Sequence, residues 1–187
     1  MSGGADSPAP LALRAARRED AESLSALVNA AYRGDSSRVG WTTEADLLGG
    51  QRTDDAAMRE FLAGGAARGD AVMLLHEDAA GPLACVQLER RGERAYLGML
   101  TIRPTAQGGG LGRALLAGAE RHARAAWGAR AIVMTVIEQR DELIAWYERR
   151  GYVRTGRHAP FPYGDARFGE PKRPDLRFVV MEKKLQC

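Results

Sequence analysis

The chain has 187 residues, of which 45% are hydrophobic and 27% are charged, and its formal net charge is +3. This composition is typical of an ordinary globular protein, and a chain of this length buries enough surface to fold without disulfides or metals. The basic residues are scattered rather than grouped in blocks. No apolar run approaches the ~20 residues of a membrane-spanning helix. Composition therefore argues against nucleic acid and membranes as partners.

The cysteines, the histidines and the N-terminal segment bear on metal binding, cellular location and the extent of the domain. Cys85 and Cys187 form no Cys-x-x-Cys pair, and the three histidines show no metal-ligand spacing. We therefore expect no metal and a cytoplasmic location. The first ten residues, MSGGADSPAP, lack the pattern of a signal peptide and predict a disordered lead-in over residues 1–10. Residues 11–187 are predicted to form a single domain.

Hydrophobic periodicity predicts the elements of the first half of the chain. A short strand is expected over residues 11–14 and a helix from about residue 18 to residue 31. Residues 33–50 are irregular, with a short helix opening at residues 43–46, and another helix follows Asp54. Three further strands are expected to pair in antiparallel fashion through short turns: 71–76, 83–89 and 94–102.

The second half alternates helices and strands. A helix is predicted over about residues 110–127, a strand over 131–137, and a helix over 141–150 that ends at Gly151. Two final strands are expected at 152–155 and 176–182, separated by a long loop rich in proline and aromatic residues. The order predicts one mixed α/β domain built on a single sheet.

Four glycines, Gly108, Gly109, Gly110 and Gly112, separate the strand at 94–102 from the next helix. The dinucleotide fingerprint GxGxxG fails here because its third glycine would fall on another residue type. The phosphate loop of nucleotide hydrolases fails because no Lys-Ser/Thr pair ends the motif. Glycines just before a helix let several backbone N–H groups converge beside its positive end. The sequence therefore predicts a cradle for a phosphate or diphosphate.

The motif Gln-x-x-Gly-x-Gly at residues 107–112 resembles the pyrophosphate loop of the GNAT superfamily, the acyl-CoA-dependent N-acyltransferases. A second stretch, AWYERRGY at residues 145–152, is similar to the late helix of that family. The resemblance implies a mixed α/β fold with a central, largely antiparallel sheet that is splayed at the strands 94–102 and 131–137. It also implies helices on both faces and one N-acetyltransferase domain over residues 11–187.

The resemblance implies acetyl-CoA (coenzyme A) as co-substrate. The pantetheine arm is expected in the gap between the splayed strands, against the main chain of residues 100–102. Arg140 stands where relatives often have asparagine, and we expect it either to reach a phosphate or to cap a strand end. The full set of expected cofactor-binding residues is Leu100, Thr101, Ile102, Gln107, Gly108, Gly109, Gly110, Leu111, Gly112, Arg113 and Arg140.

Two residues are candidates for acid–base catalysis. Tyr147 lies four residues before Gly151, which matches the proton-donating tyrosine of related acetyltransferases; the alternative is a packed aromatic on an amphipathic helix. The strand position where some relatives carry a glutamate base is Tyr96 here. Glu89, on the adjoining strand, is the candidate base through a water that Tyr96 orders, and the alternative is a solvated strand end.

The acceptor site is expected between the segment after the first helix and the last hairpin. Trp41 and Glu44 are candidates for holding a cationic amine through cation–π and charge contacts, with Tyr96 and Phe161 completing the site. The alternatives are that Trp41 belongs to the core and that Glu44 belongs to a capping box.

The leading interpretation is an N-acetyltransferase that moves the acetyl group of acetyl-CoA to a primary amine of a small molecule. A protein lysine or N-terminal acetyltransferase is an alternative, and a non-catalytic acyl-CoA-binding sensor is an alternative from another class. Because related proteins are often dimers, a homodimer is a further expectation.

Overall fold

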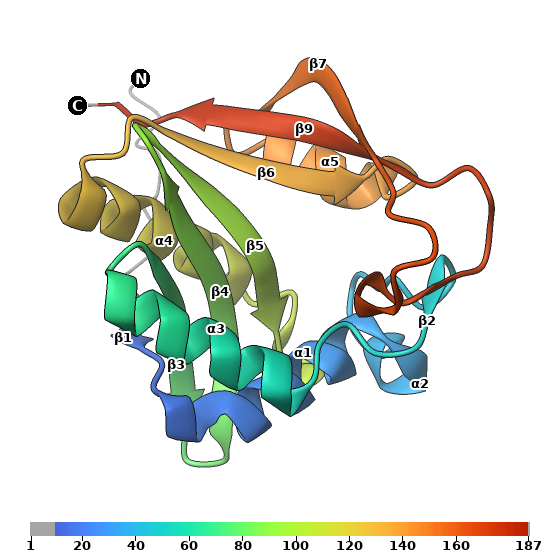
Figure 1. The fold of residues 1–187 in the computed structure, drawn as a ribbon, viewed down its shortest axis with the longest axis horizontal. Coiled ribbons are helices and arrows are strands. Elements are labelled where there is room, and N and C mark those ends of the chain that lie inside the picture. The colour runs from blue at the N-terminus through green and yellow to red at the C-terminus, as the bar shows by residue number, and fades with distance from the viewer. Residues whose placement is uncertain (1–9, 187) are drawn as a thin grey trace.

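Residues 10–186 are described by a computed structural model (Figure 1). The lead-in predicted at residues 1–10 therefore lies almost entirely outside the described residues. Seven strands form one sheet in the order β1-β3-β4-β5-β6-β9-β7, and β2 pairs with β8 separately. Helices α1 and α3 cover one face, while α4 and α5 cover the other (Figure 1). The predicted mixed α/β fold with helices on both faces is confirmed.

The first helices differ in detail from the sequence prediction. Helices α1 (Ala21–Tyr32) and α3 (Asp55–Arg68) form as expected, and β1 is reduced to Arg14–Ala15. The helix expected at residues 43–46 is wrong, because that segment is a turn and the local helix is α2 (Gly34–Ser37). The Leu47 and Leu48 N–H groups both donate to the Glu44 oxygen in a single turn, and the chain then enters the strand β2 (Leu48–Gly49) directly.

Three antiparallel strands, β3 (Ala71–Asp78), β4 (Gly81–Arg91) and β5 (Arg94–Ile102), form the centre of the sheet. The register between β4 and β5 shifts near Met99, where β5 carries an extra residue. Met99 has a φ of +43°, a conformation that costs a non-glycine residue about 1–2 kcal/mol. This bulge bends the outer part of β5.

Strands β5 and β6 (Ala131–Ile137) run parallel but pair only over three residues each. The pairing joins residues 94–96 to residues 131–133, and the two strands then separate, as the V-shaped gap in Figure 1 shows. Beyond Tyr96, β5 has no strand partner on its β6 side within the described residues. The predicted splay is confirmed.

The C-terminal third adds two helices and three strands. Helix α4 (Leu111–Trp127) starts directly after the glycine turn, and α5 (Asp141–Glu148) precedes Gly151. Strands β7 (Val153–Pro160) and β9 (Arg177–Lys184) complete the sheet; β7 starts one residue later and runs five residues further than predicted. The expected long loop therefore starts later, and part of it, β8 (Glu170–Pro171), pairs with β2 (Leu48–Gly49).

Two apolar clusters fill the space on either side of the sheet. One joins α4 and α5 to strands β4, β5, β6 and β9, and the other joins α1 and α3 to β3 and β4. Across residues 10–186, no helix combines the length and the apolar composition that crossing a membrane would require.

Two adjacent glycines in α3 give a matched test of this packing. A Cβ added at Gly65 would lie 2.5 Å from the backbone oxygen of Ala71, whereas one added at Gly64 meets only the flexible end of Arg68. Alanine otherwise stabilises a helix interior by about 0.5–1 kcal/mol relative to glycine. We expect Gly64→Ala to maintain or raise the free energy of unfolding, and Gly65→Ala to lower it by about 1–3 kcal/mol through overpacking.

Urea denaturation of the two variants measures the difference. Equal stability of Gly64→Ala and Gly65→Ala would contradict the close approach of α3 to the start of β3.

Candidate functional site

A cavity of about 420 Å³ lies where the glycine turn, the end of β5 and α5 meet. We call it the glycine-loop cavity. Its lining residues come from four parts of the chain: Ala31, Tyr32, Trp41, Thr42, Leu100, Thr101, Ile102, Gln107, Gly108, Gly110, Gly112, Arg113, Arg140, Leu143, Trp146, Tyr147, Arg149 and Arg150. Of the residues expected to bind the cofactor, all line this cavity except Gly109 and Leu111.

The glycine turn has a conformation that explains two of its glycines. Gly108 and Gly110 have φ values of +91° and +84°, which side chains rarely adopt. Gly109 has no positive φ, and a Cβ atom added there would meet no protein atom within 4 Å. Neither the backbone conformation nor packing within the described residues therefore requires glycine at this position. The free space above Gly109 is the kind of space that a ligand lying against the turn would use.

The Gln107 side chain connects two segments. Its Oε1 accepts a hydrogen bond from the Trp41 N–H at 2.6 Å, and its Nε2 donates to the Ile102 oxygen at 3.2 Å. The Trp41 ring lies 6.5 Å from the Trp146 ring, centroid to centroid. Trp41 therefore lies in the wall of the glycine-loop cavity, and not in the smaller cavity described next.

Three arginines give the outer part of this cavity a positive charge. Arg113, Arg149 and Arg150 line it, and none of them forms an ion pair with a carboxylate within residues 10–186. The Arg150 guanidinium lies 3.6 Å from the Trp146 ring centroid. Burial, together with the charges of Arg149 and Arg113, lowers the pKa of Arg150. An anionic ligand would relieve this repulsion.

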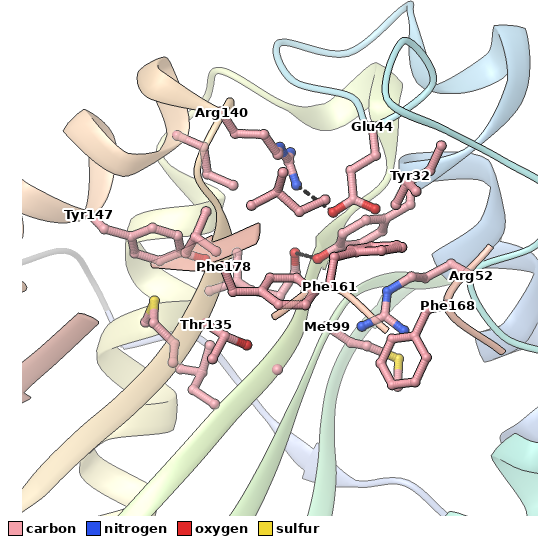
Figure 2. Close-up of a pocket in the computed structure, with 18 of the residues that line it drawn as sticks. Tyr32, Glu44, Arg52, Met99, Thr135, Arg140, Tyr147, Phe161, Phe168 and Phe178 are labelled. Atoms are coloured by element: carbon pink, nitrogen blue, oxygen red, sulfur yellow. Dashed lines mark hydrogen bonds and ion pairs between the residues drawn. The ribbon is translucent and has the colours of Figure 1, made fainter. Parts of the chain in front are cut away.

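A second cavity, of about 140 Å³, lies deeper between the splayed strands (Figure 2). We call it the arginine cavity. Its lining residues include Tyr32, Arg33, Glu44, Arg52, Tyr96, Met99, Leu100, Thr135, Arg140, Leu143, Tyr147, Phe161, Phe168 and Phe178. The two cavities share Tyr32, Leu100, Arg140, Leu143 and Tyr147. Three predicted acceptor-site residues, Tyr96, Glu44 and Phe161, line the arginine cavity.

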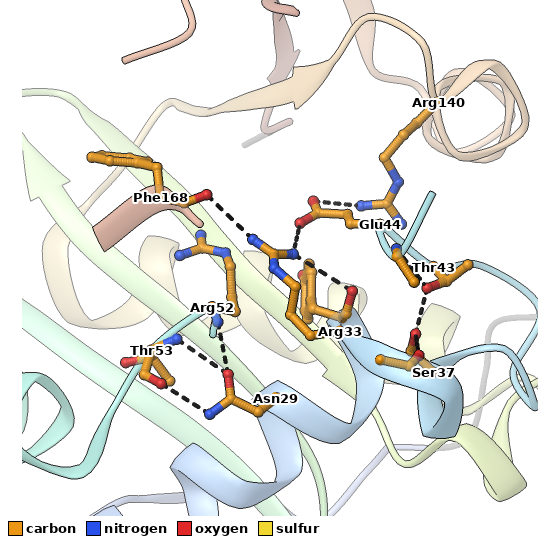
Figure 3. A network of polar contacts seen from close by, with 12 residues as sticks. Asn29, Arg33, Ser37, Thr43, Glu44, Arg52, Thr53, Arg140 and Phe168 are labelled. Carbon is orange, nitrogen blue, oxygen red and sulfur yellow. Dashed lines mark hydrogen bonds and ion pairs between the residues drawn. The ribbon is translucent and has the colours of Figure 1, made fainter. Parts of the chain in front are cut away.

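Glu44 is held between two buried arginines (Figure 3). One carboxylate oxygen accepts a hydrogen bond from Arg33, and the other accepts from Arg140 Nη1 at 2.9 Å. Arg140 Nη2 also donates to the Thr42 hydroxyl at 2.8 Å. Burial alone raises the pKa of Glu44, but the charges of Arg140, Arg33 and Arg52 outweigh burial and hold that pKa below its ordinary value.

The end of α1 positions this network. Asn29 anchors the segment that carries Arg52, because its Oδ1 accepts from the Arg52 N–H at 2.7 Å and its Nδ2 donates to the Thr53 oxygen at 2.9 Å (Figure 3). The Glu44 N–H donates to the Tyr32 oxygen at 3.3 Å. The end of α1, the Glu44 segment and the Arg52 segment thus meet at the mouth of the splay.

Tyr147 and Tyr32 lie where the two cavities meet. Tyr147 is buried, and desolvation, followed by its neighbour Tyr32, raises its pKa, so the hydroxyl keeps its proton at neutral pH. No hydrogen bond of the Tyr147 hydroxyl is present within the described residues. The Tyr32 hydroxyl donates to the Leu100 oxygen at 3.0 Å, and burial raises the pKa of Tyr32 to about 12.

Tyr96 and Glu89 lie at the closed end of the splay. The Tyr96 hydroxyl is 3.2 Å from the Thr135 hydroxyl, which bridges β5 and β6 just as they separate. Glu89 accepts a hydrogen bond from Gln87 Nε2 at 2.5 Å and lies within 3.5 Å of Arg91. Glu89 lines neither cavity, and its role as a base stays a prediction.

Sequence reasoning missed four polar residues of the arginine cavity: Tyr32, Arg33, Arg52 and Thr135. Tyr32 and Arg33 end the first helix, and the sequence carried no motif that would assign them to a site. Arg52 lies in an irregular segment, so the path of its main chain depends on the hydrogen bonds that Asn29 makes to residues 52 and 53. Among the described residues, no group of three or more histidine, cysteine, aspartate or glutamate side chains is arranged to hold a metal.

The fold and the glycine turn before α4 define an acetyltransferase of a known class. A sequence model of the Acetyltransferase (GNAT) family matches residues 39–152. The chain belongs to this family. Mycothiol acetyltransferase from Salinispora tropica is 34% identical over 97 residues, which cover 49% of this chain and 32% of that protein. The chain thus spans about a third of the length of that curated relative.

Solved structures share the fold. A ribosomal-protein-alanine N-acetyltransferase from Brucella melitensis superposes with a TM-score of 0.69 at 20% identity, covering 94% of this chain and 100% of that one. A putative acetyltransferase from Salmonella typhimurium, solved with acetyl-CoA, gives 0.68 at 18% identity over 96% of both chains. PaiA N-acetyltransferase from Thermoplasma acidophilum, solved with coenzyme A, gives 0.64 at 15% identity, covering 93% of this chain and 98% of that one. At these identities the likeness concerns the fold.

Removing the charge of Glu44 should destabilise the protein. At pH 7, Glu44→Gln leaves Arg33 and Arg140 buried without their counter-charge, and breaking such a pair costs about 3–5 kcal/mol. The folded-state pKa of Glu44 lies below the unfolded value of about 4.3, so ionised Glu44 stabilises the fold above that pH. This contribution is lost as the pH falls through the folded-state pKa.

Chemical denaturation at pH 7 and at steps below about pH 4.3 measures this effect. The difference in the free energy of unfolding between the wild type and Glu44→Gln should decrease as the pH falls. Glu60→Gln is the control, because Glu60 is exposed on α3, and its unfolding free energy should match the wild type. A difference between wild type and Glu44→Gln that does not change with pH would refute the assignment.

Proposed function

We propose that this protein is an N-acetyltransferase that moves the acetyl group of acetyl-CoA to a primary amine of a small molecule. Membership of the GNAT family supports the class of reaction. The observation that carries the proposal is the position of Tyr147, whose protonated hydroxyl lies at the junction of two cavities suited to two substrates. We assign residues 11–187 to this single catalytic domain.

The glycine-loop cavity fits coenzyme A. The three arginines that line it have no carboxylate partner within residues 10–186 and suit a diphosphate and a further phosphate, and the N-terminus of α4 adds positive potential. Gly109 does not itself line the cavity, but the open space beside it adjoins the lining residues Gly108 and Gly110. We assign the diphosphate to the backbone of residues 107–113 and the pantetheine arm to residues 100–102 on the unpaired edge of β5. Bound acetyl-CoA supplies an activated acetyl thioester.

We assign the role of general acid to Tyr147. Burial keeps its hydroxyl protonated, so a proton is available for a departing thiolate at neutral pH. Proton donation of this kind contributes about 10²–10⁴-fold in rate. Main-chain N–H groups near Leu100 are our candidates for stabilising the negative charge on the carbonyl oxygen.

The charge of the arginine cavity reduces the need for a dedicated base, and solvent water takes the proton that the amine nitrogen releases. Glu44 is already paired with two arginines, so we do not assign it the removal of a proton from the amine. Glu89 lines neither cavity, so it could act only through a water, and its role as a base stays a prediction. Positive charge nearby disfavours an ammonium ion and lowers the pKa of a bound amine. The cavity therefore favours the neutral, attacking form of the acceptor.

The size of the arginine cavity supports a small acceptor over a protein. A cavity of about 150 Å³ accommodates a molecule the size of benzene, and the arginine cavity measures about 140 Å³. Phe161 and Phe168, which belong to the segment between β7 and β9, form part of its wall.

The Tyr147→Phe variant tests the role of the hydroxyl. We expect kcat for acetylation to fall by about 10²-fold or more, while the affinity for coenzyme A stays the same because the ring remains. Release of free thiol from acetyl-CoA with a panel of amines reports the rate, and calorimetry reports the affinity. If coenzyme A binds but no amine gives thiol release, the acyl-CoA-binding sensor becomes the better interpretation.

The Gly109→Ala variant tests the cradle. An added methyl group meets no protein atom within 4 Å and needs no positive φ, so the unfolding free energy should change by no more than about 0.5 kcal/mol. We expect the dissociation constant for coenzyme A to rise by about tenfold, equivalent to ~1.4 kcal/mol, because the methyl group occupies the space assigned to a phosphate. Gly64→Ala in α3 is the matched control. Unchanged affinity in Gly109→Ala would place the diphosphate elsewhere.

A further inference from the structure

We infer that the acceptor carries a carboxylate as well as its amine, and that Arg52 binds this carboxylate. The inference rests on the proposed function and narrows the acceptor to small molecules that resemble amino acids. It follows from the charges around the arginine cavity and from their pairing.

The arginine cavity has an excess of positive charge. Arg33, Arg52 and Arg140 line it, against the single carboxylate of Glu44. Three positive charges and one negative charge leave a formal excess of +2 on the lining residues. Such a cavity repels a polyamine and attracts an anion.

Glu44 leaves no carboxylate for Arg52. Its two oxygens accept hydrogen bonds from Arg33 and from Arg140. The Arg52 guanidinium makes no hydrogen bond or ion pair within residues 10–186, and it lies 5.8 Å from the centroid of the Tyr32 ring. A partly buried guanidinium offers a planar fork of donors that matches a carboxylate.

The position of Arg52 suits a ligand that reaches across the cavity. Figure 2 shows its guanidinium beside Phe168 and Met99, on the opposite side from Tyr147. An acceptor whose carboxylate contacts Arg52 therefore directs its other end toward Tyr147. Asn29 holds the Arg52 main chain, so the segment from which the guanidinium extends is fixed before a ligand binds.

Substrate preference tests the inference. Small α-, β- and γ-amino acids are compared with the amines that lack their carboxylate, with acetyl-CoA as donor. We expect the wild type to show about tenfold or greater preference in kcat/KM for the amino acids, and Arg52→Gln to lose that preference mainly through KM. Arg52→Lys, which retains the charge, should retain part of the preference. An aminoalkylphosphonate in the same panel tells a carboxylate site from a general anion site.

Binding without turnover gives an independent readout. N-acetylated amino acids are titrated by calorimetry into the protein saturated with coenzyme A. We expect Arg52→Gln to weaken their binding by about tenfold or more. Arg59→Gln is the matched control, since it removes one positive charge from the exposed face of α3 and should leave both readouts unchanged.

The outcomes separate the two proposals. Carboxylate binding that depends on Arg52, without acetylation of any amine, supports the anion site and contradicts the proposed function. Acetylation of amines with no preference for a carboxylate supports the function and overturns the inference. A phosphonate that outperforms the carboxylates, or carboxylate binding that is the same in Arg52→Gln, also overturns it.

Discussion

The separation of β5 from β6 is the constraint on which the rest of the site depends. The two strands pair only over residues 94–96 and 131–133, and the bulge at Met99 bends β5 away beyond that point. Continued pairing would fill the gap with backbone hydrogen bonds and would close both cavities. The rest of β5, which is largely covered and paired with β4, offsets the cost of a non-glycine residue at positive φ.

Buried charge then fixes the segments that surround the gap. Glu44 sits between Arg33 and Arg140, which come from the end of α1 and from the turn before α5. Burying these groups costs solvation energy, and the network offsets that cost only when all three are in place. The irregular segment after α1, whose regular structure is limited to the short α2 and the two-residue β2, is therefore held in position largely by these charges. The same network leaves Arg52 without a carboxylate partner among the described residues.

The sequence predicted those features that depend on local pattern. The bounds of β5 and β6 and the start of α4 followed from apolar periodicity and from the glycines at residues 108–112. The helix predicted at residues 43–46 was wrong because a single turn there leads directly into β2, whose pairing with the distant β8 periodicity does not report. The sequence did not identify Arg33, Arg52 and Thr135 as site residues, because their places in the cavity depend on contacts between separate segments that periodicity does not report. Glu44 was singled out by its type, but its two arginine partners were not foreseeable.

The wall shared by the two cavities limits which substitutions can change one cavity without changing the other. Five residues, Tyr32, Leu100, Arg140, Leu143 and Tyr147, line both cavities, so replacing any of them alters the proposed acetyl-CoA site and the proposed acceptor site together. Residues such as Arg52 and Phe168 face the inner space alone and come from segments outside the central sheet. Under the proposed function, substitutions in these outlying segments would therefore change the acceptor without touching the residues assigned to acetyl-CoA.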